Sequence, residues 1–281
     1  MTTLTYTIDE LIPYISWAYF FHAWQIAPRF ASVTQVHGCT ACRTAWLNGF
    51  SADDKPQAQV AMELYAEAEA MLRTLAAEGE KVVARFAILP CRSDGDDLVF
   101  EDQWRLPCLR QQRVEGVCLC LSDYVLPQGS DKGDGVNDRV GLFATTAGRV
   151  GEYDMLRQTL LDRLAEAAAE KMHEQVRKTY WGYAPDEHLT MTELHSERFQ
   201  GIRPAIGYPC LPDQRVIFPI YRRLRLNEVG IALTETGAMN PHASTCGLLL
   251  AHPATRYFAV GNISPEQQQL YEQRLQACLQ A

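Results

Sequence analysis

The sequence lacks the features that would place it in a membrane or on nucleic acid. Its apolar runs stay well short of the roughly 20 residues that a membrane-spanning helix needs. The first 14 residues contain no basic segment and carry Asp9 and Glu10, so they do not read as a secretory signal peptide. Lysine and arginine together number 26 against 34 acidic residues, a net charge of −8, and the densest basic cluster is only Arg222, Arg223 and Arg225. Proteins that bind nucleic acid usually present a strongly basic surface, so we do not expect nucleic acid as a partner. The short apolar runs likewise give no reason to expect a membrane.

The sequence also lacks the pattern of a disulfide framework. Its nine cysteines are odd in number and scattered, which favours a reducing compartment and a cytoplasmic location. Cys39 and Cys42 form a Cys-x-x-Cys pair, which can be half of a zinc site or a redox pair. His37, Cys118 and Cys120 would have to supply further ligands, and a metal or redox protein built on these cysteines is one rival hypothesis. Free cysteine usually behaves as a small apolar residue, so we expect buried thiols and no metal site.

Composition and pattern predict a soluble-type α+β fold. The 281 residues, 47% hydrophobic and 21% charged, suffice for one large core. We expect a single domain over residues 1–281, with an irregular cysteine-containing insert at 28–57. Strands arranged mostly as hairpins indicate a mostly antiparallel sheet flanked by long helices.

The expected elements follow from local patterns. Trp17, Phe20, Phe21 and Trp24 share one face of a short helix, and that face is expected in the core. A turn at Ser93–Asp96 is typical of a hairpin. Further helices are predicted at 57–79, 153–180, 190–200 and 264–279, and strands at 82–90, 97–101, 117–126, 140–148, 231–234, 246–251 and 256–260.

The stretch 199–213, FQGIRPAIGYPCLPD, is the most informative in the chain. Its three prolines exclude a regular helix or a central strand, so the backbone is expected to be a rigid, extended loop. Gly207 permits a positive φ or a close approach to the main chain. Arg203 offers a fork of donors suited to a carboxylate or phosphate, and Tyr208 adds a flat face.

Four stretches in order resemble one known family. They are RPAIGYP at 203–209, LTETGAM at 233–239, HPATRYFAV at 252–260 and VRKTYWGYAP at 176–185. Together they resemble the activation domain of cobalamin-dependent methionine synthase, which binds S-adenosylmethionine and has a curved sheet with helices around it. The likeness covers nearly the whole chain, from about residue 11 to about 271. That domain usually ends a much larger enzyme, whereas this sequence begins with Met and ends soon after the likeness does, so we expect a free-standing version.

The resemblance implies which residues contact S-adenosylmethionine. The family pattern YIxWxxFFxxW matches the chain from Tyr14 to Trp24, but Ser16 stands where the family usually has an aspartate that contacts the ligand. Serine keeps a hydrogen bond and loses the negative charge. Glu166 corresponds to a glutamate that the family places close to the ligand. The other positions carried over from the family are Arg203, Ala205, Gly207, Tyr208, Tyr257 and Phe258.

The resemblance further implies reductive methylation without a catalytic side chain from this protein. In the family, inactive cob(II)alamin takes an electron, from flavodoxin in bacteria, and then accepts the methyl group of S-adenosylmethionine. This sequence has no cobalamin-binding domain, so cobalamin is expected on a partner, a methionine synthase lacking its own activation domain, with a flavodoxin-like electron donor. The chain would be a methyltransferase component in methionine biosynthesis, with Tyr208 facing the cobalamin. The alternative, which Ser16 favours, is a degenerate module that binds S-adenosylmethionine or a corrinoid protein without turnover.

Overall fold

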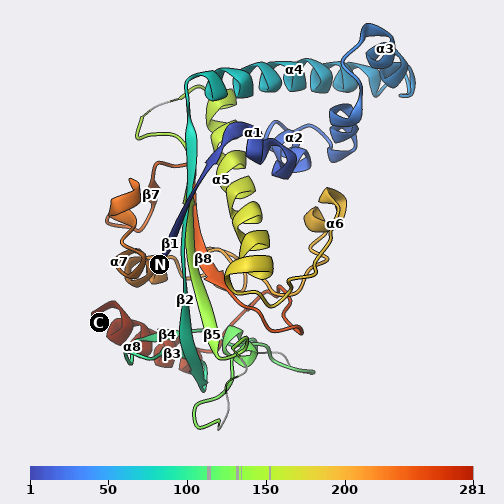
Figure 1. Cartoon of the computed structure of the whole chain (residues 1–281). Helices are drawn as coiled ribbons and strands as arrows, with labels where there is room; N and C mark the ends of the chain where they lie inside the picture. The colour runs from blue at the N-terminus through green and yellow to red at the C-terminus, as the bar shows by residue number, and fades with distance from the viewer. Residues whose placement is uncertain (113–114, 131–132, 134, 152, 281) are drawn as a thin grey trace.

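The computed structural model describes residues 1–112, 115–130, 133, 135–151 and 153–280. It has the predicted α+β architecture, in which a curled antiparallel sheet lies between two groups of helices (Figure 1). The strands of this sheet are β1 (Thr2–Thr7), β2 (Lys81–Asp94), β3 (Asp97–Phe100), β4 (Arg105–Pro107), β5 (Arg139–Thr146) and β8 (Ser244–Leu249).

The long strand β2 organises the sheet. Its first half pairs with β1 and its second half with β3 on the same edge, while β5 pairs along the other edge. β4 extends the sheet beyond β3, and β8 extends it beyond β5. The β2–β3 hairpin turns at Gly95, whose φ of 59° suits glycine, as the sequence predicts. β1 was not predicted, although its alternation of threonine with Leu4 and Tyr6 is typical of a half-buried strand.

Each face of the sheet carries its own apolar core, because successive side chains of a strand point to opposite faces. On β5, Val140, Leu142 and Ala144 join one core, and Phe143 joins the other. The first core packs against α7 (Ile217–Leu224) and α8 (Pro265–Gln280), and the second against α4 (Lys55–Ala77) and α5 (Met155–Gln175). Figure 1 shows α5 and α7 on opposite sides of the sheet.

The long predicted helices are confirmed as α4, α5 and α8, with ends set by local chemistry. Asp154 caps α5 by accepting a hydrogen bond from the Arg157 N–H at 2.8 Å. α4 ends before Gly79, whose φ of 72° fits a helix terminus. The aromatic stripe is also confirmed as core, since α2 (Trp17–Ala23) fully buries Phe20 and Phe21.

The remaining elements are short. They are α1 (Ile8–Leu11), η1 (Ile12–Tyr14), η2 (Pro28–Gln35), α3 (Thr40–Asn48), η3 (Leu121–Tyr124), η4 (Val176–Tyr180), α6 (Met191–His195), η5 (Gln214–Val216), η6 (Leu226–Val229), β6 (Ala232–Leu233) and β7 (Met239–Asn240).

Three expectations are wrong in detail. The segment 28–57 is not irregular, because Pro28 opens η2 and Cys39 caps α3. The strand predicted at 117–126 does not form; η3 lies there instead, and the Asp123 carboxylate accepts a hydrogen bond from the Cys120 N–H at 2.8 Å, which favours a turn. Residues 256–260 form no strand, because the edge of β8 that they were expected to cover is taken by the loop described below.

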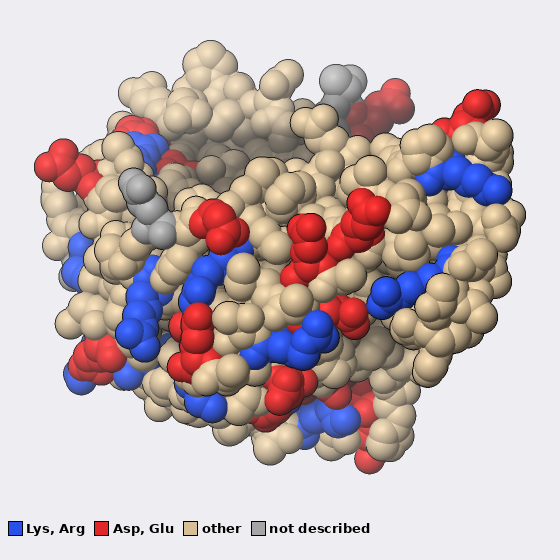
Figure 2. Space-filling view, turned by 90° about the horizontal axis from the view of Figure 1, so that it is seen from above, with Lys and Arg blue, Asp and Glu red and all other residues tan. Residues whose placement is uncertain are grey.

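The outer surface seen from above mixes charges of both signs. Figure 2 shows acidic and basic side chains interspersed over this face, with neither sign forming a continuous patch. Among the described residues, the helices are too short or too polar to cross a bilayer.

Candidate ligand pocket at Arg203

The proline-rich loop is held against the edge of β8. The Ile202 N–H donates to the Leu250 carbonyl at 2.9 Å, and the Leu248 N–H donates to the Pro204 carbonyl at 3.0 Å. Gly247 makes this approach possible, because a Cβ there would lie 2.2 Å from the Pro204 carbonyl oxygen. Part of the loop backbone is therefore paired with the sheet, and is not the unpaired extended loop that the sequence predicted.

The end of the loop closes into a tight turn. Gly207 has a φ of 92°, and its N–H donates to the Leu211 carbonyl at 2.9 Å. The Tyr208 N–H donates to the Ala205 carbonyl at 3.0 Å. These two amide donors therefore shape the loop itself, and this turn sets the position of the Tyr208 ring.

Arg203 reaches from the loop to α5, where it pairs with Glu170. A guanidinium Nη donates to Glu170 Oε2, and the two side chains are only 13% and 8% exposed. Burial by itself would lower the pKa of Arg203, but the Glu170 carboxylate, with smaller contributions from Tyr257 and Glu166, raises it well above its ordinary value. Arg203 is therefore a fixed cation.

This ion pair is incompletely satisfied. Arg203 Nε and Glu170 Oε1 are both buried and have no hydrogen-bond partner among the described residues. Buried polar atoms in folded proteins are nearly always paired, so unpaired ones call for a bound molecule or another partner. Both atoms belong to the same ion pair at the pocket.

A pocket of about 320 Å³ opens at this ion pair, near the lower end of the roughly 300–1,000 Å³ typical of small-molecule sites. Four residues expected to contact a ligand line it, namely Ser16, Glu166, Arg203 and Tyr208. Its other lining residues were not predicted; they are Tyr14, Tyr19, Arg163, Glu170, His195 and Glu197.

The other four expected site residues lie beside the pocket. Ala205 and Gly207 shape the loop, as described above. The Tyr257 hydroxyl accepts a hydrogen bond from the Arg203 N–H at 3.1 Å, and its ring centroid lies 6.0 Å from that of Tyr208. Phe258 is buried in the core next to it. Tyr257 thus holds the loop backbone at Arg203, and Phe258 anchors the neighbouring chain in the core.

The pocket is rich in charge of both signs. Carboxylates come from Glu166, Glu170 and Glu197, and guanidinium groups from Arg163 and Arg203. Desolvation at the rim raises the pKa of Glu197, and Glu170 adds to this rise while Arg203 opposes it. Such a lining suits a ligand that carries cationic groups together with a carboxylate.

A second buried ion-pair network lies where α5 ends and η4 begins. Arg177 binds Glu187 through two hydrogen bonds of 2.7 and 2.9 Å and stacks 4.0 Å from the Phe199 ring. His173 is fully buried near it, and burial, with Arg177 and Arg203 nearby, holds the pKa of His173 well below its ordinary value. This neutral histidine and the paired Arg177 fix the start of the loop, because Phe199 is its first residue.

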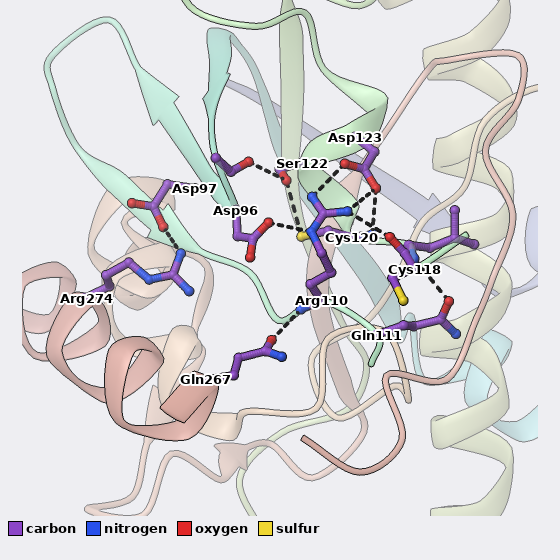
Figure 3. Close-up of polar contacts among 12 residues, drawn as sticks. Asp96, Asp97, Arg110, Gln111, Cys118, Cys120, Ser122, Asp123, Gln267 and Arg274 are labelled. Atoms are coloured by element: carbon purple, nitrogen blue, oxygen red, sulfur yellow. Dashed lines mark hydrogen bonds and ion pairs between the residues drawn. The ribbon is translucent and has the colours of Figure 1, made fainter. Parts of the chain in front are cut away.

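A larger cleft, of about 790 Å³, lies against α8, but its two arginines, Arg110 and Arg274, are already paired with aspartates. Figure 3 shows Arg110 between Asp96 and Asp123, with N–O distances of 2.7 Å to each carboxylate. The Arg110 N–H also donates to Gln267 of α8 at 2.8 Å. We assign this network the structural role of fastening the β2–β3 hairpin to α8.

The sequence contains an indication of only some of the pocket-lining residues that were not predicted. Glu170 follows Glu166 by four residues, so the two lie on the same helix face. His195, the last residue of α6, and Glu197 just after it line the pocket through tertiary packing, in which His195 Nε2 lies 3.2 Å from the Tyr14 carbonyl oxygen. Nothing local in the sequence indicates that contact.

The fold and the pocket define a class of α+β domain with a charged pocket between a sheet-edge loop and a long helix. The family model described as the vitamin B12 dependent methionine synthase activation domain matches residues 7–276, and the chain belongs to this family. A crystal structure of the MetH reactivation domain bound to AdoHcy is similar over 99% of this chain and 88% of that chain, with a TM-score of 0.79 and 31% sequence identity. The resemblance drawn from the four motifs is confirmed.

Proposed function

We propose that this chain binds S-adenosylmethionine in the Arg203 pocket and supports the reactivation of a cobalamin-dependent methionine synthase supplied by a partner. The observation that carries this proposal is the buried, incompletely satisfied Arg203–Glu170 pair beside two further carboxylates. Membership of the activation domain family and similarity to a domain bound to AdoHcy support it.

The residues present fit the chemistry of this ligand. Arg203 has five N–H donors, of which one binds Glu170, so the others are suited to the ligand carboxylate. Glu166 and Glu197 would face its ammonium and sulfonium cations, and Tyr208 offers a ring face to a cation or a base. Ser16 would supply a hydrogen bond where most relatives supply a charge.

In this function the side chains bind and orient rather than react. S-adenosylmethionine supplies a methyl group when bound, and the partner's cobalamin is its acceptor. Arg203, fixed by Glu170 and by the paired loop, would hold the amino-acid end, which sets the direction in which the methyl group points. Tyr19, 66% exposed at the pocket mouth, and Tyr208 would lie toward the cobalamin side.

The partner and the electron donor are also proposals. We infer a methionine synthase that lacks its own activation domain, a flavodoxin-like donor and a cytoplasmic setting. The test combines this chain with such a synthase in its oxidised form, S-adenosylmethionine and a reductant. Methylcobalamin should form, as followed by its absorption spectrum. Failure of the wild-type chain to restore it, with the synthase shown to be competent, would overturn the reactivation role.

Ser16 keeps one alternative under consideration, a module that binds S-adenosylmethionine or a corrinoid protein without turnover. Calorimetry together with the methylcobalamin assay, on wild type and Ser16→Asp, separates the two, because the added carboxylate should tighten binding of the cationic ligand and the assay reports turnover. If the wild type binds S-adenosylmethionine and still restores no methylcobalamin, while Ser16→Asp does, the alternative holds for the natural sequence.

A further inference from the structure

Three side chains of types that ligate metals converge at the start of α3, and none of them lines the Arg203 pocket. One ligand atom from each of His37, Cys39 and Cys42 lies within 4.8 Å of the others, and among the described residues they form a group that could hold a metal ion. We call them the His37 cluster. Figure 1 places α3 at the outer end of α4.

Local structure holds the cluster together. Cys39 is the N-cap of α3, and its Sγ accepts a hydrogen bond from the Cys42 N–H at 3.3 Å. The Cys39 N–H in turn donates to His37 Nδ1 at 3.4 Å. The turn at Gly38 thus brings the imidazole to the same side as the two sulfur atoms, before any metal is bound.

Core packing does not explain these thiols. Cys39 is exposed and Cys42 half-buried, which corrects the expectation that both are buried. α3 has no buried residue at all among its described positions. Six of the other cysteines are buried, as small apolar residues usually are. The remaining one, Cys118, lies with Cys120 in the loop near Arg110, away from α3 (Figures 1 and 3).

We propose that His37, Cys39 and Cys42 bind one Zn²⁺ ion, with a fourth position open to water or to a donor from another molecule. Thiolate and imidazole are the ligands that zinc prefers, and three protein ligands with an open position is an established arrangement. Zn–S bonds of about 2.3 Å and Zn–N bonds of about 2.0 Å need ligand atoms roughly 3.3–3.8 Å apart. Small side-chain rotations from the present spacing suffice.

The imidazole of His37 favours a metal site over a simple redox pair of cysteines. Thiol–disulfide exchange would need only the two sulfur atoms, whereas a third donor that converges on them adds coordinating capacity. Binding involves no electron transfer. Two thiols and a neutral imidazole take up Zn²⁺ with the release of up to two protons. The ion would join the segment after η2 to the first turn of α3.

The test uses the full-length chain, reduced with a non-thiol reductant and freed of metal by a chelator. Calorimetric titration with ZnCl₂ should show one ion per chain, and Co²⁺ should give the thiolate-to-metal charge-transfer absorption of a sulfur-ligated site. His37→Ala and Cys42→Ser should each weaken binding at least about tenfold. The double variant Cys39→Ser, Cys42→Ser should abolish it.

Cys118→Ser is the matched control, because this cysteine is also half-buried but lies outside the cluster. It should leave the affinity unchanged. Absence of zinc binding by the wild type, or binding retained in the double variant, would overturn the proposal. Unchanged affinity in His37→Ala would rule out the three-donor site. If oxidised glutathione converts the pair to a disulfide as readily with stoichiometric zinc as without it, the pair is a redox dithiol instead.

Discussion

The Arg203 pocket and the His37 cluster show two opposite ways of holding reactive side chains. In the pocket, the Arg203–Glu170 pair is largely buried and is held by a long helix, a sheet edge and a second ion-pair network. In the cluster, the side chains lie at the surface and depend only on hydrogen bonds within six residues. The central ion pair of the pocket is thus tied into the core, whereas the cluster rests on local contacts in a helix that buries no residue.

Replacement of Arg203 should have the largest effect. Arg203→Ala leaves the Glu170 carboxylate buried without its partner, so the free energy of unfolding should fall by about 3–5 kcal/mol. Affinity for S-adenosylmethionine should fall at least about 100-fold, equivalent to about 2.7 kcal/mol. Urea unfolding and calorimetry measure the two effects.

Two further variants make this prediction sharper. Arg203→Lys keeps the charge and loses the fork, so it should recover most of the stability but little of the affinity. Arg163→Ala is the control, because Arg163 also lines the pocket but pairs with no carboxylate in the described part of the chain. Equal loss of stability in Arg163→Ala and Arg203→Ala would contradict the special place given to the buried pair.

Gly247→Ala should test the attachment of the loop to the sheet. The added Cβ would meet the Pro204 carbonyl oxygen and the Ala205 Cα, both backbone atoms, so the loop must move. We expect a loss of about 1–3 kcal/mol in the free energy of unfolding and weaker binding of S-adenosylmethionine. Gly151→Ala, where a Cβ would have nothing within 4 Å, should change neither. Intact binding in Gly247→Ala would show that the loop position is not set by β8.

The raised pKa of Glu197 predicts a modest pH dependence of ligand binding. The ionised carboxylate favours a cationic ligand, and a raised pKa means that Glu197 takes up its proton at a higher pH than an ordinary glutamate. Affinity should therefore weaken as the pH falls through that raised pKa, by a few-fold. Glu197→Gln should flatten this part of the profile measured by calorimetry. Superimposable profiles for the two proteins would exclude Glu197 from the site.

The smallest effect is expected at the cluster. In the absence of metal, Cys39→Ser combined with Cys42→Ser should leave the urea midpoint and the affinity for S-adenosylmethionine unchanged, because α3 buries no residue and contributes none to the lining of the pocket. A shifted midpoint would show that the segment contributes to the fold after all.

The sequence predicted the parts of the molecule that local rules govern. The long helices, the β2–β3 hairpin and the aromatic stripe at Phe20 and Phe21 follow from periodicity, capping and turn residues. The prolines also indicated a rigid loop at Arg203. The segment 117–126 was misread because side-chain hydrogen bonds of Asp123 compete with strand pairing there.

Contacts between distant parts of the chain were not predictable in this way. The family resemblance indicated Arg203, but not that Glu170 holds it or that Glu197, just after α6, lines the same pocket. Burial of Cys39 was expected from residue type alone, and the structure exposes it because α3 packs on one end of a helix instead of in the core. Whether residues 1–281 act as one domain and which partner they serve stay predictions.

The pairing of residues 202–206 with β8 has a consequence for assembly. An uncovered strand at the side of a sheet is a template onto which another molecule can add its own strand. Here the amide of Leu248 and the amide and carbonyl groups of Leu250 are already engaged by the loop at 202–206. The loop proposed to hold the methyl donor therefore also shields this edge of the sheet from pairing with strands of other molecules.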